Sequence, residues 1–161
     1  MIAAVVSADE LRAVMRRVPV GVAVVTVDAG GQPAGLTVAS LVSLSLEPPL
    51  VGIAVARQAA LHELLREARA FAVSLLAAGQ EPLAEHFARG VPPIVMWHGI
   101  AASDGELGAP LLDGAVGWLE CRLGEELSAG THTFFVGEVV RAVEGTDGPP
   151  LVRRGGAFLS A

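Results

Sequence analysis

The sequence predicts a mainly β fold, an antiparallel barrel or sandwich with short helices at its periphery. Segments rich in β-branched or alternating apolar residues outnumber the helical patterns, and each helical pattern is short. Two pairs of predicted strands are joined by glycine-containing turns, which is typical of antiparallel hairpins. A parallel sheet would need a regular series of crossover helices, and the sequence shows no such series.

The composition is consistent with one domain over 1–161, because a chain of 161 residues can bury a substantial core. Hydrophobic residues make up 52% of the chain and charged residues 17%, whereas charged residues average about 25% in a typical domain. This surplus of apolar residues predicts that part of the surface is covered in a homodimer.

The first helix is predicted to begin at a capping box, Ser7 to Glu10, and to end at Pro19. A nearly continuous run of β-branched and small residues from Val20 to Val27 indicates a buried strand. The turn at 28–33 predicts a hairpin, and its second strand starts at about Ala34.

A strand over 50–56 is followed by a short helix with apolar residues on one face over 61–68, and by an alternating strand over 71–75. Pro82 suits the first turn of another short helix, which Gly90 follows. These patterns place helices between strands and outside the hairpins.

The segment from Val91 to Asp113 is rich in proline and glycine and has no clear period, so it predicts a long loop. Two long strands follow, over 115–123 and 132–143, joined by a turn at 128–131. The tail at 149–158 predicts a turn and one last short strand.

The stretch from Gly35 to Leu50, GLTVASLVSLSLEPPL, carries four hydroxyls in an otherwise apolar segment: Thr37, Ser40, Ser43 and Ser45. A buried hydroxyl without a partner costs about 1–3 kcal/mol. These oxygens therefore bond either to the backbone, which is the commoner arrangement, or to a polar ligand. Small residues with free N–H groups suit a ligand that carries a phosphate and a polyhydroxyl chain.

Several other functions are disfavoured. The net charge of −6 argues against a nucleic-acid partner, and no apolar run is long enough for a membrane partner. The start of the chain has no secretory signal pattern and Cys121 is the only cysteine, so a cytoplasmic location is expected. The histidines His62, His86 and His98 have no metal-binding spacing, so no metal is predicted.

The sequence also lacks the glycine-flanked serine of acyl-transfer enzymes, the glycine fingerprint of the Rossmann unit and the P-loop. Any dinucleotide must therefore bind without a Rossmann unit. Cys121 occupies an inward position of an alternating strand and is predicted to be an inert core thiol.

Taken with its neighbours, the hydroxyl stretch resembles the flavin reductase family, the small reductase components of two-component flavin-dependent monooxygenases. The motifs that carry the resemblance follow one another over nearly the whole chain: PVGVAVVT, GLTVASLVSLSLEPPLVGIAV, FAVSLL, EPLAEHFA, GAPLLDGAVGWLEC, GTHTFFVGEVV and PLVRRGGAF. The resemblance implies a six-stranded antiparallel split barrel that dimerises and holds FMN or FAD near the subunit interface. It also implies NADH or NADPH as the hydride donor and a separate oxygenase as the acceptor of reduced flavin.

The resemblance further implies a set of flavin-binding residues: Thr37, Val38, Ala39, Ser40, Ser43, Leu44, Ser45, Ala54, Arg57, His62, Phe87 and Arg153. Arg57 is expected near the flavin phosphate, since its planar guanidinium can bind two phosphate oxygens. The family often has a Ser and then a Thr after this position, where this chain has Ala59 and Leu61. Arg57 or His62 is therefore expected to compensate.

His132 is the predicted catalytic residue. The family usually has Gly-Asp-His at this place, and this chain has Gly130, Thr131 and His132, so an orienting carboxylate is missing. Hydride transfer needs alignment more than proton transfer, so the expected role of His132 is to position the reacting rings. Without the resemblance, an exposed imidazole at the start of a strand is the simpler interpretation.

The function predicted from these features is an NAD(P)H-dependent flavin reductase that supplies reduced FMN or FAD to a separate monooxygenase. An alternative is a non-catalytic flavin-binding protein for storage or sensing, which the absence of an Asp before His132 favours. A split-barrel oxidase acting on a phosphorylated small substrate is a third hypothesis, and it fits the motifs less well.

Overall fold

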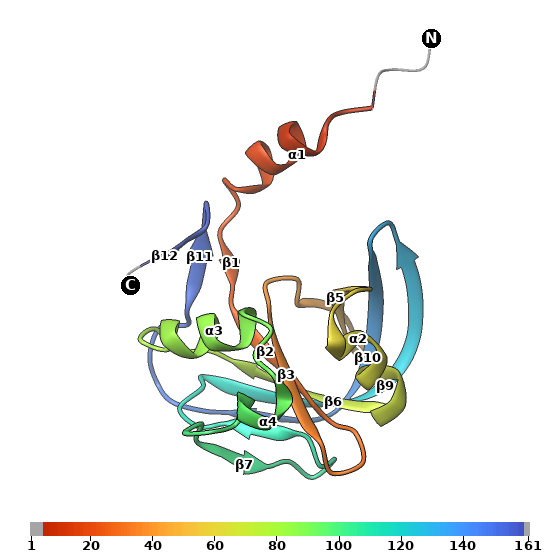
Figure 1. The fold of residues 1–161 in the computed structure, drawn as a ribbon, viewed down its shortest axis with the longest axis vertical. Coiled ribbons are helices and arrows are strands. Elements are labelled where there is room, and N and C mark those ends of the chain that lie inside the picture. The colour runs from red at the N-terminus through yellow and green to blue at the C-terminus, as the bar shows by residue number, and fades with distance from the viewer. Residues whose placement is uncertain (1–4, 160–161) are drawn as a thin grey trace.

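The computed structural model describes residues 5–159, so the ends of the domain predicted over 1–161 lie outside the described residues. Its main sheet has seven antiparallel strands in the order β3-β2-β6-β9-β10-β5-β4 (Figure 1). These strands are β2 (Ala23–Asp28), β3 (Pro33–Val38), β4 (Val42–Leu46), β5 (Pro49–Ala56), β6 (Ala70–Leu75), β9 (Gly117–Ala129) and β10 (His132–Glu144).

The two end strands of this sheet, β3 and β4, are joined by residues 39–41 alone, so the sheet must curve back on itself as a split barrel. The predicted mainly β, antiparallel class is confirmed. The main sheet has one strand more than the predicted six, because the hydroxyl stretch is interrupted at 39–41 and forms two strands.

Two smaller sheets accompany the barrel. A three-stranded sheet has the order β1-β11-β12 and consists of β1 (Val20–Gly21), β11 (Val152–Arg154) and β12 (Ala157–Leu159). Because Val22 interrupts the predicted strand over 20–27, its first residues pair with β11, near the end of the chain, and its remainder forms β2.

The helices α1 (Ala8–Met15), α2 (Ala60–Ala68) and α3 (Glu81–Ala88) lie where the sequence predicts them. The capping box of α1 is present, but the helix ends at Met15 instead of Pro19 and buries none of its residues. Figure 1 shows α1 projecting away from the barrel, above β1 and β11.

The prediction of one long loop over 91–113 is wrong. The segment contains a short helix, α4 (Pro93–Met96), and a hairpin of β7 (Ala102–Asp104) and β8 (Pro110–Leu112). Elements of three or four residues are too short to produce a readable period, and they are held by distant contacts instead. Trp97, for example, donates a hydrogen bond from Nε1 to the Pro33 carbonyl at 2.8 Å.

The core lies between the barrel wall and the helices α2 and α3. Its large, fully buried side chains include Phe71, Phe135, Ile53 and Leu65. Gly137 on β10 has no side chain, which leaves room for the Phe71 ring against the sheet. In the described part of the chain, no helix has the length and hydropathy needed to cross a membrane.

Candidate functional site at one end of the barrel

The corner between β3 and β4 is the centre of the candidate site. Ser40 Oγ accepts a hydrogen bond from the Ala54 N–H at 3.0 Å and donates one to the Ala54 carbonyl at 3.1 Å, which fixes the corner against β5. Among the described residues, the N–H groups of 39–41 take no part in backbone–backbone pairing. The corner therefore presents the small side chains of Ala39 and Ser40 together with backbone donors.

Thr37 leads into this corner from β3. Its hydroxyl donates to the Ala84 carbonyl on α3 at 2.6 Å, so it too has a backbone partner. A cavity of about 210 Å³ lies beside it, between the end of β3, helix α3 and the β11–β12 turn. Its lining includes three of the predicted flavin residues of β3 and its corner together with Arg153: Thr37, Val38, Ala39 and Arg153.

A second cavity, of about 440 Å³, adjoins the first and extends toward α1. The two cavities share Ala39, Arg153 and Gly156. Sequence reasoning missed three arginines that line the larger one: Arg12, Arg16 and Arg154. Their only signal in the sequence is that they occur in two basic clusters, one near each end of the chain.

His132 and Arg57 come together at the β9–β10 turn. The Arg57 N–H donates to the Thr131 carbonyl at 3.1 Å, and the Arg57 guanidinium donates to the Ser128 hydroxyl. His132 is exposed, and its Nδ1 lies 2.9 Å from the Thr131 hydroxyl. A neutral hydroxyl thus contacts the imidazole in the place of the missing carboxylate, and Nε2 remains available to a ligand.

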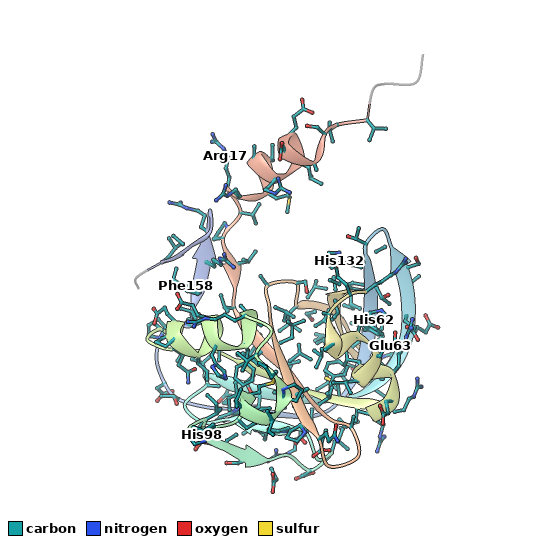
Figure 2. All side chains as sticks on the ribbon, viewed as in Figure 1. Arg17, His62, Glu63, His98, His132 and Phe158 are labelled. Atoms are coloured by element: carbon teal, nitrogen blue, oxygen red, sulfur yellow. The ribbon has the colours of Figure 1, made fainter. Side chains whose placement is uncertain are left out.

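The turn and the corner are neighbours on β5. His132 pairs with Ala56 across the β5–β10 ladder, and Ser40 bonds to Ala54, two residues earlier on the same strand. The corner and the turn are therefore held against β5 at positions only two residues apart. Figure 2 shows His132 at the tip of this hairpin, at the end of the barrel from which α1 projects.

His62 is not free to bind a phosphate in this structure. The side chain is 3% exposed, and its ring lies 5.2 Å from the Phe135 ring in an edge contact. Its Nδ1 lies 2.8 Å from a Glu63 carboxylate oxygen and its Nε2 lies 2.7 Å from the Thr133 hydroxyl. The hydrogen bond from His62 lowers the pKa of the Glu63 carboxyl. His62 therefore links α2 to β10 beneath the site.

Phe87 also lies in the core. It is 2% exposed and packs against Trp97 with ring centroids 5.3 Å apart, so its ring does not line the cavities. Helix α3 contributes other residues to the smaller cavity: Ala84, Glu85 and Ala88. Phe87 therefore lines neither cavity, although its helix contributes to the smaller one.

The remaining predicted residues, Ser43, Leu44 and Ser45, belong to β4, an edge strand of the main sheet. The β4–β5 register is irregular between Ser43 and Ser45, and the Leu44 side chain is 45% exposed. These residues line neither of the two cavities, and the strand leaves one edge without a partner in a single copy of the chain.

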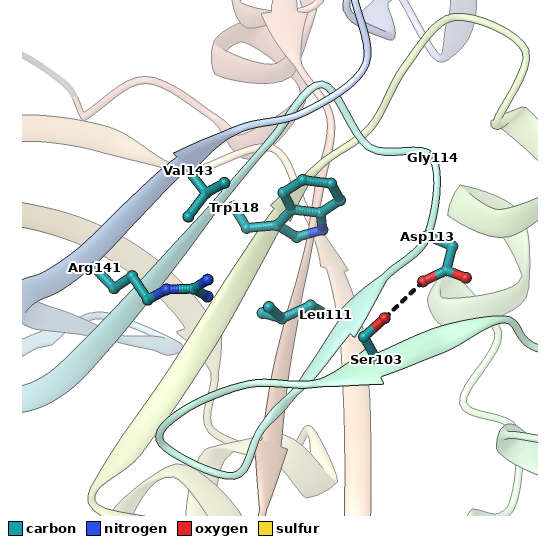
Figure 3. A pocket seen from close by; sticks show the side chains of 7 residues that line it. All are labelled: Ser103, Leu111, Asp113, Gly114, Trp118, Arg141 and Val143. Atoms are coloured by element: carbon teal, nitrogen blue, oxygen red, sulfur yellow. Dashed lines mark hydrogen bonds between the residues drawn. The ribbon is translucent and has the colours of Figure 1, made fainter.

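Another cavity, of about 350 Å³, contains none of the predicted residues (Figure 3). It lies beside Trp118 and the β7–β8 hairpin, and Arg141 reaches into it. Arg141 is within 2.8 Å of the buried Glu120 carboxylate and 3.3 Å of Glu106. Because two carboxylates balance its charge, this guanidinium serves the structure and leaves the cavity without a free cation.

Comparisons with known proteins agree with this geometry. The family model for the flavin reductase like domain matches residues 15–160. An NADH-dependent FAD reductase from Streptomyces globisporus is 42% identical over 156 residues, which cover 92% of this chain and 83% of that protein. The reductase component of a 4-hydroxyphenylacetate 3-monooxygenase from Thermus thermophilus is 41% identical over 144 residues, which cover 89% of this chain and 90% of that protein.

A solved structure is similarly close. The NADH:FAD oxidoreductase from Streptomyces globisporus, in complex with NAD and FAD fragments, superposes with a TM-score of 0.90 at 40% identity. The superposition covers 99% of this chain and 97% of that one.

Proposed function

Because this chain belongs to the family of flavin reductase-like domains, we propose that it is an NAD(P)H-dependent flavin reductase that supplies reduced FMN or FAD to a separate monooxygenase. The observation that carries the proposal is the similarity over nearly the whole chain to an NADH:FAD oxidoreductase, in fold and in sequence. A monooxygenase partner is supported by the relative that is named as a reductase component.

The flavin site runs from the smaller cavity to the β9–β10 turn. Thr37, Val38, Ala39 and Ser40 hold the ring and its polyhydroxyl chain, chiefly through the N–H groups of the corner, because the Thr37 and Ser40 hydroxyls already bond to backbone. Ala54 lies against the corner. Arg153 closes the cavity on the other side. Bound flavin supplies the redox-active ring that takes a hydride from the nicotinamide.

Arg57 provides a phosphate contact at the beginning of α2. The N-cap of this helix is Ala59, which makes no side-chain hydrogen bond, so the first N–H groups of α2 lack a side-chain partner. Leu61 is 3% exposed and packs in the core, so it offers no hydroxyl to a phosphate. Arg57 and backbone donors together suit an anion. His62 and Phe87 are not part of the proposed site, because both are buried elsewhere.

His132 positions the two substrates. Its Nδ1 contacts Thr131, which orients the ring, and its backbone pairs with Ala56, two residues from the Ala54 that holds the corner. An imidazole held in this way can align a nicotinamide over a flavin without exchanging a proton. The alternative function, a flavin-binding protein without reductase activity, rests on the replacement of the usual Asp by Thr131 and on the missing hydroxyls near Arg57.

The active form is a homodimer in the cytoplasm, and the exposed apolar residues support the dimer. Three of them lie on α1 and three on the edge strand β4: Leu11, Val14, Met15, Val42, Leu44 and Leu46. Leu46 is 83% exposed on this edge strand, and a large exposed apolar side chain on an edge strand favours association with another chain. A second copy seated on β4 would bring Ser43, Leu44 and Ser45 to the edge of a flavin bound between the subunits.

The test is the initial rate of NADH and NADPH oxidation with added FMN or FAD. The proposal expects a rate that depends on flavin concentration and saturates. Tight flavin binding without oxidation of either nucleotide would support the non-catalytic alternative. Absence of both binding and oxidation would contradict flavin chemistry altogether.

A further inference from the structure

The exposed tip of the β9–β10 hairpin ends at a buried polar contact. Residues 124–132 are exposed, and Thr133, which is 4% exposed, is the first buried residue after them. The Thr133 hydroxyl lies 2.7 Å from Nε2 of His62, which is 3% exposed on α2. Figure 2 shows His62 below His132, toward the body of the barrel. This hydrogen bond therefore anchors the base of the exposed tip to helix α2.

The partners of His62 determine the direction of this hydrogen bond. Its Nδ1 lies 2.8 Å from the Glu63 carboxylate, and the hydrogen bond from His62 lowers the pKa of that carboxyl, so Glu63 is ionised and can only accept. Nδ1 therefore carries the proton of the neutral imidazole, and Nε2 accepts from the Thr133 hydroxyl. The Phe135 ring packs against the imidazole, with ring centroids 5.2 Å apart. These contacts hold His62 in one orientation.

A second connection between α2 and the hairpin is exposed. Arg66 Nε donates to the Glu126 carboxylate at 2.9 Å, and Arg66 also pairs with Glu63 at 3.0 Å. Exposed ion pairs of this kind contribute little, because water competes for both partners. Breaking the buried hydrogen bond of His62 costs more, because the polar group that remains has neither its partner nor water. His62 is therefore the stronger of the two connections.

His62 lies between the two ends of the proposed flavin site. It belongs to the first turn of α2, and Arg57, the proposed phosphate contact, lies just before that helix. Its partner Thr133 directly follows His132, which is proposed to align the nicotinamide with the flavin ring. A shift of β10 relative to α2 would change the distance between these two contacts. A misplacement of about 1 Å can lower a rate by up to about 100-fold.

We propose that His62 is a positioning residue for the reaction, because it holds the beginning of β10 against α2 and so fixes His132 relative to the phosphate contact at Arg57. The inference rests on the proposed function. His62 touches neither substrate and exchanges no proton with either, so its effect passes through His132. Loss of the hydrogen bond between His62 and Thr133 should therefore slow the reaction in folded protein and leave the affinity for flavin nearly unchanged.

The test compares kcat in variants that break the hydrogen bond from either side, once urea unfolding has shown that each variant is folded. His62→Leu and Thr133→Val should each lower kcat about fivefold, while the KM of NADH and the Kd of FMN change less than about twofold. His62→Gln, whose amide can still bond to the Thr133 hydroxyl, should recover about half of the wild-type kcat. If His62→Leu does not fold, the other two variants make the comparison.

Thr26→Val is the matched control. The Thr26 hydroxyl is also buried and donates to the Pro110 carbonyl of β8 at 2.6 Å, away from the site. This variant should lose stability as Thr133→Val does and keep the wild-type kcat. In protein that already carries His132→Ala, His62→Leu should lower kcat less than about twofold further, because a residue that acts through His132 has no effect once His132 is absent.

Hydrogen exchange gives a readout that needs no flavin and no turnover. The amides of residues 132–135 should exchange about tenfold faster in Thr133→Val than in wild-type protein, because the beginning of β10 then opens more readily. The amides of residues 139–143, toward the other end of β10, should exchange at wild-type rates. Thr26→Val should leave exchange in both segments unchanged.

Wild-type kcat in folded His62→Leu and Thr133→Val would overturn the proposal, because His62 would then serve stability alone. Effects of His62→Leu and His132→Ala that multiply in full, or unchanged exchange over 132–135, would also overturn it. The proposed function fails separately. In that case the wild-type protein oxidises no NADH with any flavin, and hydrogen exchange still decides whether His62 holds the beginning of β10.

Discussion

Cys121 carries a titratable thiol inside the hydrophobic core. The residue is fully buried on β9, and burial, with a smaller effect of Glu120, raises the pKa of its thiol from 9.0 to about 12. The sequence contains no Tyr and no Lys, so Cys121 is the only side chain expected to titrate between these two pH values.

A pH dependence of stability follows. Between about pH 9 and 12 the unfolded chain loses the thiol proton and the native chain keeps it, so the free energy of unfolding falls as the pH rises, by at most about 1.4 kcal/mol per pH unit. Below pH 9 the thiol contributes no slope. Urea unfolding at a series of pH values measures this, and Cys121→Val is the comparison. An equal slope in both proteins would rule Cys121 out as its source.

His132 is the residue on which the catalytic proposal depends most. We expect His132→Ala to lower kcat about tenfold, which is the effect expected from the loss of one positioning contact. The Kd of the flavin should change less than about twofold. Thr131→Ala, which removes only the hydroxyl beside Nδ1, should have a smaller effect in the same direction. Steady-state kinetics and flavin titration measure the two quantities. Unchanged kcat in His132→Ala would remove the residue from the mechanism.

At the scale of elements, α2 lacks a side-chain cap. Ala59 has the extended backbone of an N-cap, with φ −73° and ψ 136°, but no oxygen to accept a hydrogen bond. Ala59→Ser should therefore raise the free energy of unfolding by about 1 kcal/mol. Ala60→Ser, one position inside the helix, is the control and should be neutral or slightly destabilising. Denaturant titration separates the two, and equal effects would contradict the cap assignment.

Most elements could be predicted from the sequence because their apolar periods and turn residues are local. The segment 91–113 could not, because its short elements depend on partners outside it. The Met96 carbonyl accepts a hydrogen bond from His86 at 2.6 Å, and Trp97 donates one to the Pro33 carbonyl at 2.8 Å. The candidate site could likewise be predicted only in part from the sequence. The hydroxyl stretch drew attention to the corner, but nothing local indicates that Arg16 meets the β11–β12 turn, since only the pairing of β1 with β11 brings them together.

The strand period correctly predicted that Cys121 is buried, but the family resemblance placed two buried helix residues, His62 and Phe87, in the flavin site. His62 and Phe87 stand close to the site along the chain, yet both point into the core, because each lies on the face of its helix that packs against the barrel. A motif shared with a family shows that a residue is near the site, and it does not show on which side of the helix it lies.

At the scale of the whole molecule, we expect a second copy of the chain to pack against the β4 edge. Leu44→Asp with Leu46→Asp should convert the dimer to a monomer and weaken flavin binding, because a charged edge strand resists pairing. Ile94→Asp is the control, since Ile94 is 92% exposed on α4, away from this strand. Sedimentation velocity measures the change. A wild-type protein that sediments as a monomer would contradict the dimer.

The central claim is that flavin binds at the β3–β4 corner, between the Thr37 cavity and the β9–β10 turn. A crystal structure of the protein with FMN tests it most directly. We expect the ring to lie against Ala39 and Ser40, with His132 beside it and the phosphate near Arg57. FMN bound elsewhere, with the corner filled by the protein's own side chains, would contradict it.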